Sequence, residues 1–209
     1  MNAMCGKKIA ITSPSPQTTR NALRGILTAS EGQLLFLDTP GYHTSEKRFN
    51  QHLQQIAVSS LNDSDIVLYV ADATRQPGEE EQQILSLLSR QQTQIIGAVN
   101  KCDLSVAKPK ISQHAASDIL GEIPFVKTSA ETGQGIQELI DTLFAHAPEG
   151  EPLYPEEYYT DQSPEFRIAE LIREQVINRV SQEVPHAVYV EVSDIEFDEQ
   201  KETLWIRAF

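Results

Sequence analysis

Ile95-Ile96-Gly97-Ala98-Val99-Asn100-Lys101-Cys102-Asp103 is the stretch that decides the fold. Its apolar beginning is typical of a strand covered on both faces, and a polar tetrapeptide follows at once. The carboxylate of Asp103 can accept two hydrogen bonds from N1 and N2 of guanine, which adenine cannot donate, and such bonds contribute about 1.5–3 kcal/mol each. Asn100 would tie this base loop (residues 100–103) to its neighbours, and the stem of Lys101 would cover the purine face. On its own the tetrapeptide could also be a polar turn.

Similar apolar runs lie on both sides of this stretch, at Leu34–Leu37, Ile66–Val70 and Phe125–Val126. Between them, Glu80–Arg90 and Ile136–Phe144 place their apolar residues on one helical face. This alternation predicts an α/β fold with a mostly parallel sheet wrapped by helices. Ligands of such sheets bind at the carboxyl ends of the strands.

Two more strands are followed by turns that could carry chemistry. Asp38-Thr39-Pro40-Gly41 comes where nucleotide hydrolases use an aspartate to hold magnesium and a glycine amide to approach the terminal phosphate, although it could simply be a turn. In Ser129-Ala130-Glu131 the amide of Ala130 could bond the guanine oxygen while Ser129 braces the base loop. Three such motifs in this order, each after its own strand, favour a guanine-nucleotide site over chance.

The whole pattern resembles the translation-factor-related GTPases, and among them the Era family. The resemblance covers nearly the whole chain and is carried by Ile9–Ser13 with Gln17–Arg20, Asp38–Gly41 with Lys47-Arg48, Asn100–Asp103, Ser129–Gly133, Ile172–Glu174, Glu183–His186 and Val190–Val192. The last three segments are similar to the opening of the Era KH domain, which binds RNA.

The resemblance implies a P-loop-NTPase-like fold that binds GTP or GDP with Mg²⁺. Thr19, in the switch loop, and Asp38 would meet the metal. The nucleotide would contact residues of three turns: Asp38, Thr39, Pro40, Gly41 and Tyr42; Asn100, Lys101, Cys102 and Asp103; Ser129, Ala130 and Glu131. Tyr42 stands where Ras-like enzymes keep a water-positioning glutamine, so no catalytic side chain is identified.

Composition divides the chain near its prolines. Residues 1–147 are expected to form the Era-type GTP-binding domain, 148–162 a linker, and 163–209 part of a type II KH domain, an α+β unit whose helix starts at Ser163-Pro164-Glu165. After that helix, Ala187–Val192 and Leu204–Phe209 are predicted to be strands.

Two family motifs are not found in the 209 residues: a Gly-x-x-x-x-Gly-Lys-Ser phosphate loop, and a Gly-x-x-Gly loop after the predicted helix. Met1–Lys8 is typical of a helix end and its turn. We therefore expect a chain truncated at both ends, which lacks the first strand and the phosphate loop and stops before the RNA clamp.

Through the resemblance, the expected function is GTP hydrolysis linked to maturation of the small ribosomal subunit and binding of its 16S rRNA, by a monomer. The net charge of −13 argues mildly against nucleic acid, because phosphate neutralisation dominates such binding. A non-hydrolysing scaffold on pre-ribosomal particles and a remnant without function stay as alternatives. No apolar run approaches the roughly 18 residues of a membrane helix, so the chain is expected in the cytoplasm, with peripheral inner-membrane association implied by the resemblance.

Overall fold

A three-stranded parallel sheet forms the centre of the fold. The computed structural model describes residues 1–13, 22–38, 61, 63–179, 188–199 and 201–209. Strands β3 (Ile66–Asp72), β4 (Gln94–Asn100) and β5 (Phe125–Lys127) pair in that order, with Asp72 opposite Asn100. The carboxyl ends of the three strands therefore meet at one edge, and the predicted parallel sheet is confirmed.

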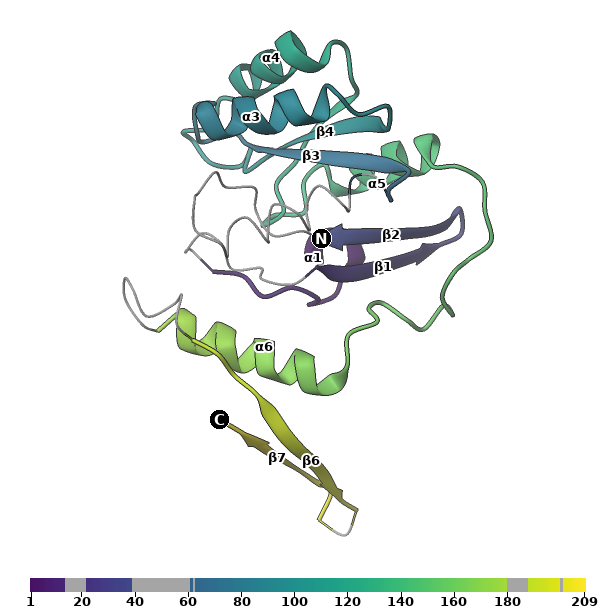
Figure 1. Ribbon diagram of the computed structural model, residues 1–209, viewed down its shortest axis with the longest axis vertical. Coiled ribbons are helices and arrows are strands. Elements are labelled where there is room, and N and C mark those ends of the chain that lie inside the picture. Colours follow the sequence, from purple (N-terminus) through teal and green to yellow (C-terminus); the bar gives the residue numbers. More distant parts are fainter. Residues whose placement is uncertain (14–21, 39–60, 62, 180–187, 200) are drawn as a thin grey trace.

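Helices cover both faces of this sheet (Figure 1). On one face, α3 (Glu79–Leu88) and α4 (Pro109–Leu120) pack on a buried cluster that includes Ile95 of β4. On the other face, α5 (Ile136–His146) packs on a second cluster that includes the next residue, Ile96. Successive residues of β4 face opposite ways and both are buried, which explains its continuous apolar run.

A second, antiparallel sheet contains the first predicted strand. Leu34–Leu37 lies within β2 (Gly32–Asp38), which pairs with β1 (Leu23–Ala29), and no ladder joins β2 to β3 among the described residues. Leu34 and Phe36 nevertheless pack against the cluster beneath α5, so the two sheets share one core. Neither β1 nor α4 is predicted from the sequence pattern.

The amino-terminal residues form the predicted helix end and turn. Helix α1 (Asn2–Cys5) ends at Gly6, whose φ of 61° is the left-handed conformation that glycine adopts without strain. The Asn2 carboxamide accepts hydrogen bonds from the amides of Ile9 and Ala10, at 3.0 and 2.9 Å. This fixes the segment that leads towards residue 13.

The predicted linker is fastened along β1. We call residues 153–161 the strap. The amide of Ile26 donates to the carbonyl of Tyr159 over 2.9 Å, and the Thr160 hydroxyl donates to the carbonyl of Arg24 over 2.7 Å. The Arg24 guanidinium also pairs with Asp161. The strap is therefore an ordered part of the fold, despite its linker-like composition.

Helix α6 (Pro164–Ile177) begins where the sequence predicts. The hydroxyl of Ser163 accepts a hydrogen bond from the amide of Phe166, as expected for a helix cap. Further along, the buried Glu174 accepts hydrogen bonds from Lys8 Nζ over 2.6 Å and from the Thr12 amide over 2.7 Å. Burial alone would raise the pKa of Glu174, but these partners outweigh it and lower that pKa.

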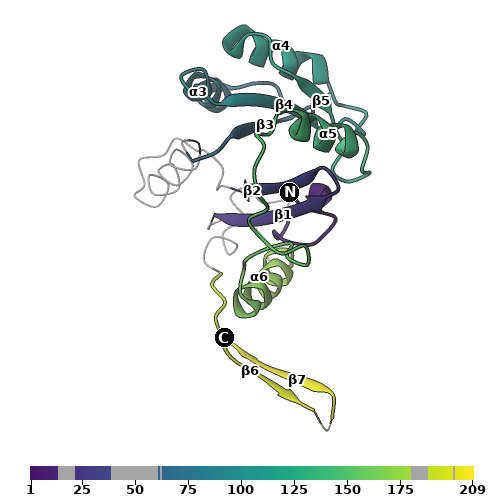
Figure 2. The ribbon, with the colours of Figure 1, turned by 90° about the vertical axis from the view of Figure 1, so that its right-hand side faces the viewer.

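A hairpin of β6 (Val192–Asp198) and β7 (Thr203–Ala208) projects away from the rest of the molecule, as both views show (Figures 1 and 2). The strand predicted at Ala187–Val192 is displaced: β6 begins at Val192, and Glu191 just before it exchanges backbone hydrogen bonds with Phe209. Residues 188–190 precede β6 and are not part of a described strand, and Ala187 lies outside the described residues. None of the helices in the described ranges has the length and apolar content to traverse a bilayer.

The contact between α6 and the amino-terminal segment predicts a pH-dependent stability. Replacing Glu174 by Gln removes the charge that Lys8 requires, and we expect the free energy of unfolding at pH 7 to fall by about 1–3 kcal/mol. Because the folded-state pKa of Glu174 is lowered, its contribution is present above the ordinary carboxyl pKa of about 4.3 and disappears as pH falls through the lowered value.

Urea unfolding of wild type and E174Q, from about a unit below the ordinary carboxyl pKa up to about pH 8, measures this difference. E156Q, at an exposed glutamate of the strap, is the matched control and should be neutral at every pH. If the difference in the free energy of unfolding between wild type and E174Q were as large at the lowest pH as at pH 7, the role assigned to the Glu174 charge would be contradicted.

Candidate functional site

The candidate site lies at the edge where the parallel strands end. β3 ends at Asp72, β4 at Asn100, and β5 is followed by the buried Thr128 and Ser129. Since Asp72 stands opposite Asn100 and Val99 opposite Lys127, the polar residues that follow come together in space. The structure thus places the two predicted base-binding turns side by side.

Asn100 connects these turns. Its side-chain oxygen Oδ1 accepts hydrogen bonds from the amide of Ala130 over 2.9 Å and from the hydroxyl of Thr128 over 3.3 Å. The amide of Cys102 donates to the carbonyl of Thr128 over 3.1 Å. The Ala130 amide, which the sequence suggests for the guanine oxygen, is therefore engaged by Asn100, and a ligand would have to share its hydrogen.

Ser129 organises the second turn, residues 129–135, which we call the serine loop. The side chain is fully buried, and its hydroxyl accepts from the amide of Thr132 over 3.1 Å. The loop closes at Gly135, where φ is +71° and an added Cβ would lie 2.0 Å from the carbonyl oxygen of Lys127. Only glycine fits so close to that oxygen, and α5 begins directly after it. Glu131 is exposed on this loop.

Lys101 has an unusual backbone and a fixed side chain. Its φ of 65° lies in the left-handed region. Its ammonium donates to Asp72 Oδ2 over 2.7 Å, while Asp72 Oδ1 accepts from the amide and the hydroxyl of Thr74. Burial would raise the pKa of Asp72, but the hydrogen bonds from Lys101 and Thr74 outweigh it and lower that pKa.

Asp72 is absent from the sequence predictions. The signal available was a carboxylate that ends an apolar strand, immediately before a predicted ligand edge. Such a residue is common in α/β proteins, and its partner, Lys101, is identified only by the register of β3 against β4.

Asp103 differs from its neighbours in having no partner among the residues that the structure describes. The residue is exposed, and within the described ranges its carboxylate makes no hydrogen bond or ion pair. The thiol of Cys102, by contrast, donates to the carbonyl of Val99 over 3.1 Å. The base loop is therefore held by Asn100 and Cys102, and Asp103 presents two unoccupied acceptor oxygens to a ligand.

Most of the predicted phosphate and metal residues lie outside the described residues: Thr19, Thr39, Pro40, Gly41 and Tyr42. Asp38 is described. It is half-buried at the end of β2, opposite Leu23. The described part of the chain contains no group of three or more His, Cys, Asp or Glu side chains that could hold a metal ion.

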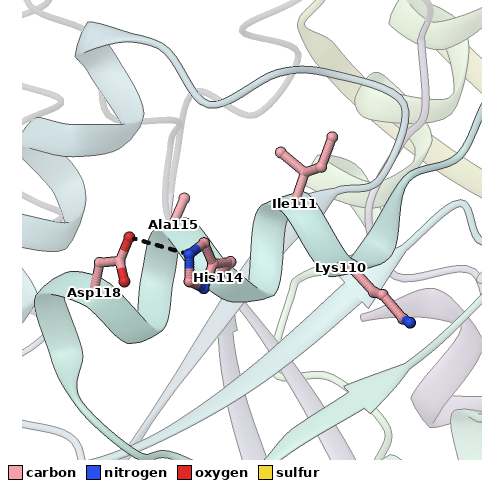
Figure 3. Close-up of a pocket in the computed structure, with 5 residues that line it drawn as sticks. All are labelled: Lys110, Ile111, His114, Ala115 and Asp118. Carbon is pink, nitrogen blue, oxygen red and sulfur yellow. Dashed lines mark ion pairs between the residues drawn. The ribbon is translucent and has the colours of Figure 1, made fainter.

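A hollow of about 510 Å³ lies elsewhere, on the outer surface of α4 (Figure 3). It is lined by Lys110, Ile111, His114, Ala115 and Asp118, and His114 faces Asp118 across 3.9 Å. Both members of that pair are largely exposed, and none of the predicted binding residues lines the hollow. The hollow is therefore not part of the candidate site.

Comparison with known proteins identifies close relatives. A family model described as 50S ribosome-binding GTPase matches residues 1–101. GTPase Era of Treponema denticola is 45% identical over all of this chain and 72% of its own length, and GTPase Era of Borreliella burgdorferi is 39% identical over 71% of its length.

Solved structures agree with this relationship. Era in complex with MgGDPNP and nucleotides 1506–1542 of 16S ribosomal RNA superposes with a TM-score of 0.90, at 28% identity, over 99% of this chain and 71% of that one. Aquifex aeolicus Era bound to GDP and AlF4⁻ gives 0.89 at 30% identity, over the same shares.

Asn100 and Asp103 of the base loop are predicted to differ in their contribution to stability. Asn100→Ala removes the acceptor that joins the base and serine loops, and we expect the free energy of unfolding to fall by about 1–2 kcal/mol. Asp103→Ala removes no hydrogen bond or ion pair with the described residues and should change the free energy of unfolding by less than about 0.5 kcal/mol. Urea unfolding without nucleotide measures both, and equal losses in the two variants would disprove this division of roles.

Proposed function

Because this chain belongs to the Era family of GTPases, we propose that it binds guanine nucleotide and acts on the ribosomal RNA of the small subunit. The proposal of guanine binding rests on the carboxylate of Asp103, which has no partner among the described residues. The loop that bears it is held in place by Asn100. Guanine presents two adjacent donors, N1–H and N2–H, to a carboxylate, whereas adenine presents an acceptor at N1. A fixed acceptor pair therefore selects guanine.

Lys101 and the serine loop complete the base pocket in this proposal. The stem of Lys101 covers one face of the purine, and the amide of Ala130 lies beside Asn100 where the guanine oxygen would come. Ser129 and Glu131 hold and flank this loop, and the backbone of Cys102 continues the base loop to Asp103.

GTP, GDP and Mg²⁺ are the ligands we assign to the rest of the site. Asp38 and Thr39–Gly41, with Tyr42, follow β2 and would meet the phosphates, while Thr19 and Asp38 would meet the metal. The magnesium ion would neutralise phosphate charge. Since these 209 residues contain no Gly-x-x-x-x-Gly-Lys-Ser run, we expect affinity measured on them to depend on the base loops.

We propose three parts for the chain: a nucleotide-binding domain at 1–147, a connecting segment at 148–162, and KH-type elements at 163–209 that contact RNA. The related Era was solved with nucleotides 1506–1542 of 16S rRNA, and we propose the corresponding RNA as the partner of this chain. Maturation of the small subunit would take place in the cytoplasm; peripheral membrane association stays a prediction of the resemblance.

The nucleotide proposal predicts a base switch at Asp103. With a fluorescent GDP analogue and Mg²⁺, GTP should compete with the wild-type chain and ATP should not. Asp103→Asn should weaken guanine binding at least about tenfold, since each lost charge-assisted bond contributes roughly 1.5–3 kcal/mol. The new amide can donate to the C2 carbonyl of xanthine, so xanthosine diphosphate should gain relative to GDP.

Asp118→Asn, at an exposed aspartate of α4, is the matched control and should bind like the wild type. An unchanged preference of D103N for GTP over ATP would sink the assignment of the base loop. A folded wild-type chain without saturable GDP binding would show that these residues do not suffice for the proposed function.

The RNA proposal is tested separately. An RNA with the sequence of nucleotides 1506–1542 of 16S ribosomal RNA is titrated with the chain at low and at physiological salt. A shuffled RNA of the same composition is titrated in the same way. Preference for the native sequence supports the proposal. Equal binding of both RNAs, lost as salt rises, would indicate only non-specific phosphate contacts.

A further inference from the structure

Both carboxylate oxygens of Asp72, at the end of β3, accept hydrogen bonds from other residues. One oxygen, Oδ1, accepts from the Thr74 amide over 2.9 Å and from the Thr74 hydroxyl over 2.6 Å. The other, Oδ2, accepts from Lys101 Nζ over 2.7 Å. Thr74 therefore fixes the carboxylate from one side, so that it meets the lysine in a single orientation.

The turn that carries Asp72 is also joined to the base loop through the backbone. The amide of Ala73 donates to the carbonyl of Asn100 over 2.9 Å, and the amide of Lys108 donates to the carbonyl of Ala73 over 2.7 Å. Asp72 and Lys101 thus lie on two segments that are hydrogen-bonded to each other at Asn100, the first residue of the base loop, and at Lys108, beyond its end. Their separation is set by the sheet, independently of the ion pair itself.

This ion pair is poorly suited to a purely stabilising role. The side chains of Lys101 and Asp72 are 52% and 25% exposed. Pairs this open to water contribute little to folding, partly because a lysine loses much of its rotamer freedom when it is held. The same restriction is useful for binding, since a side chain ordered in advance costs a ligand nothing further.

From this geometry we propose that Asp72 is a positioning residue of the guanine site, which holds Lys101 in the extended form that covers the purine. The inference rests on the proposed function. Asp72 also gives the ammonium a counter-charge. Lys101 is two residues from Asp103, and a lysine without Asp72 would be drawn to that carboxylate and occupy the oxygens that read the base. Asp72 therefore acts through Lys101 and touches no ligand atom.

A double-mutant cycle on nucleotide affinity separates this role from a structural one. Asp72→Asn keeps the oxygen that Thr74 needs and loses the charge that Lys101 needs. We expect D72N to weaken binding of the fluorescent GDP analogue about three- to tenfold, and K101M to weaken it too. The double variant should bind no more weakly than K101M, because Asp72 has no target once the ammonium is gone.

D198N is the matched control, since it also removes one negative charge from a surface pair, that of Asp198 with Lys201 on the distant hairpin. It should leave GDP affinity unchanged. If Asp72 only supports the fold, D72N will weaken the K101M background as much as the wild type, and the proposal is overturned.

A readout without nucleotide keeps the two proposals apart. Acetic anhydride labelling, followed by mass spectrometry, should modify Lys101 slowly in the wild type and at least about threefold faster in D72N, because the amine is released from its acceptor. Lys108, exposed and outside the pair, should label equally in both. Unchanged Lys101 labelling refutes the positioning role. A wild-type chain that binds no GDP refutes the proposed function instead, and the labelling still decides whether Asp72 holds the lysine.

Discussion

The geometry of the site depends on one side-chain oxygen, Asn100 Oδ1. The parallel register brings the ends of β4 and β5 together, but the loops that leave adjacent strands can diverge once the ladder ends. Asn100 opposes this by accepting from Ala130 and Thr128 at once, and the backbone hydrogen bond from Cys102 to Thr128 adds to it. A neutral amide oxygen suits this position, since a carboxylate there would place a second negative charge beside Asp103.

Two lysine–carboxylate contacts in the molecule illustrate how burial decides what an ion pair does. Glu174 is a buried residue of α6 and accepts from the amide of Thr12 as well as from Lys8, so it fastens two distant parts of the chain. Asp72 is partly exposed and bonded locally to Thr74, so it mainly orients Lys101. The extent of burial thus separates the stabilising pair from the orienting one.

The sequence predicts the elements whose burial is regular. β3, β4, α3 and α5 were recognisable because their apolar residues recur with the period of a strand or helix. β1 was missed since Arg24, Gly25 and Thr28 interrupt its apolar run, and α4 was missed since its inward residues include the small Ser112 and Ala116.

For the site, the sequence predicted the residues that we assign to the nucleotide and could not show how they are held. The base loop and Ser129 lie together as their order along the strands implies. The engagement of the Ala130 amide and the partnership of Asp72 with Lys101 depend on the spacing of neighbouring strands. Thr19 and Thr39–Tyr42 lie outside the described residues, so their roles stay predictions.

The strap changes how the connection between the two ends of the chain should be understood. A free chain of that composition would act as a tether, and the effective concentration of α6 at its contact with Lys8 would depend on tether length. Here Asp161 is anchored to Arg24, and Ser163 already caps α6. Almost no free chain therefore separates the strap from α6. Inserting residues between Asp161 and Ser163 would lower the effective concentration of α6 at its contact with Lys8, whereas inserting them before the strap would not.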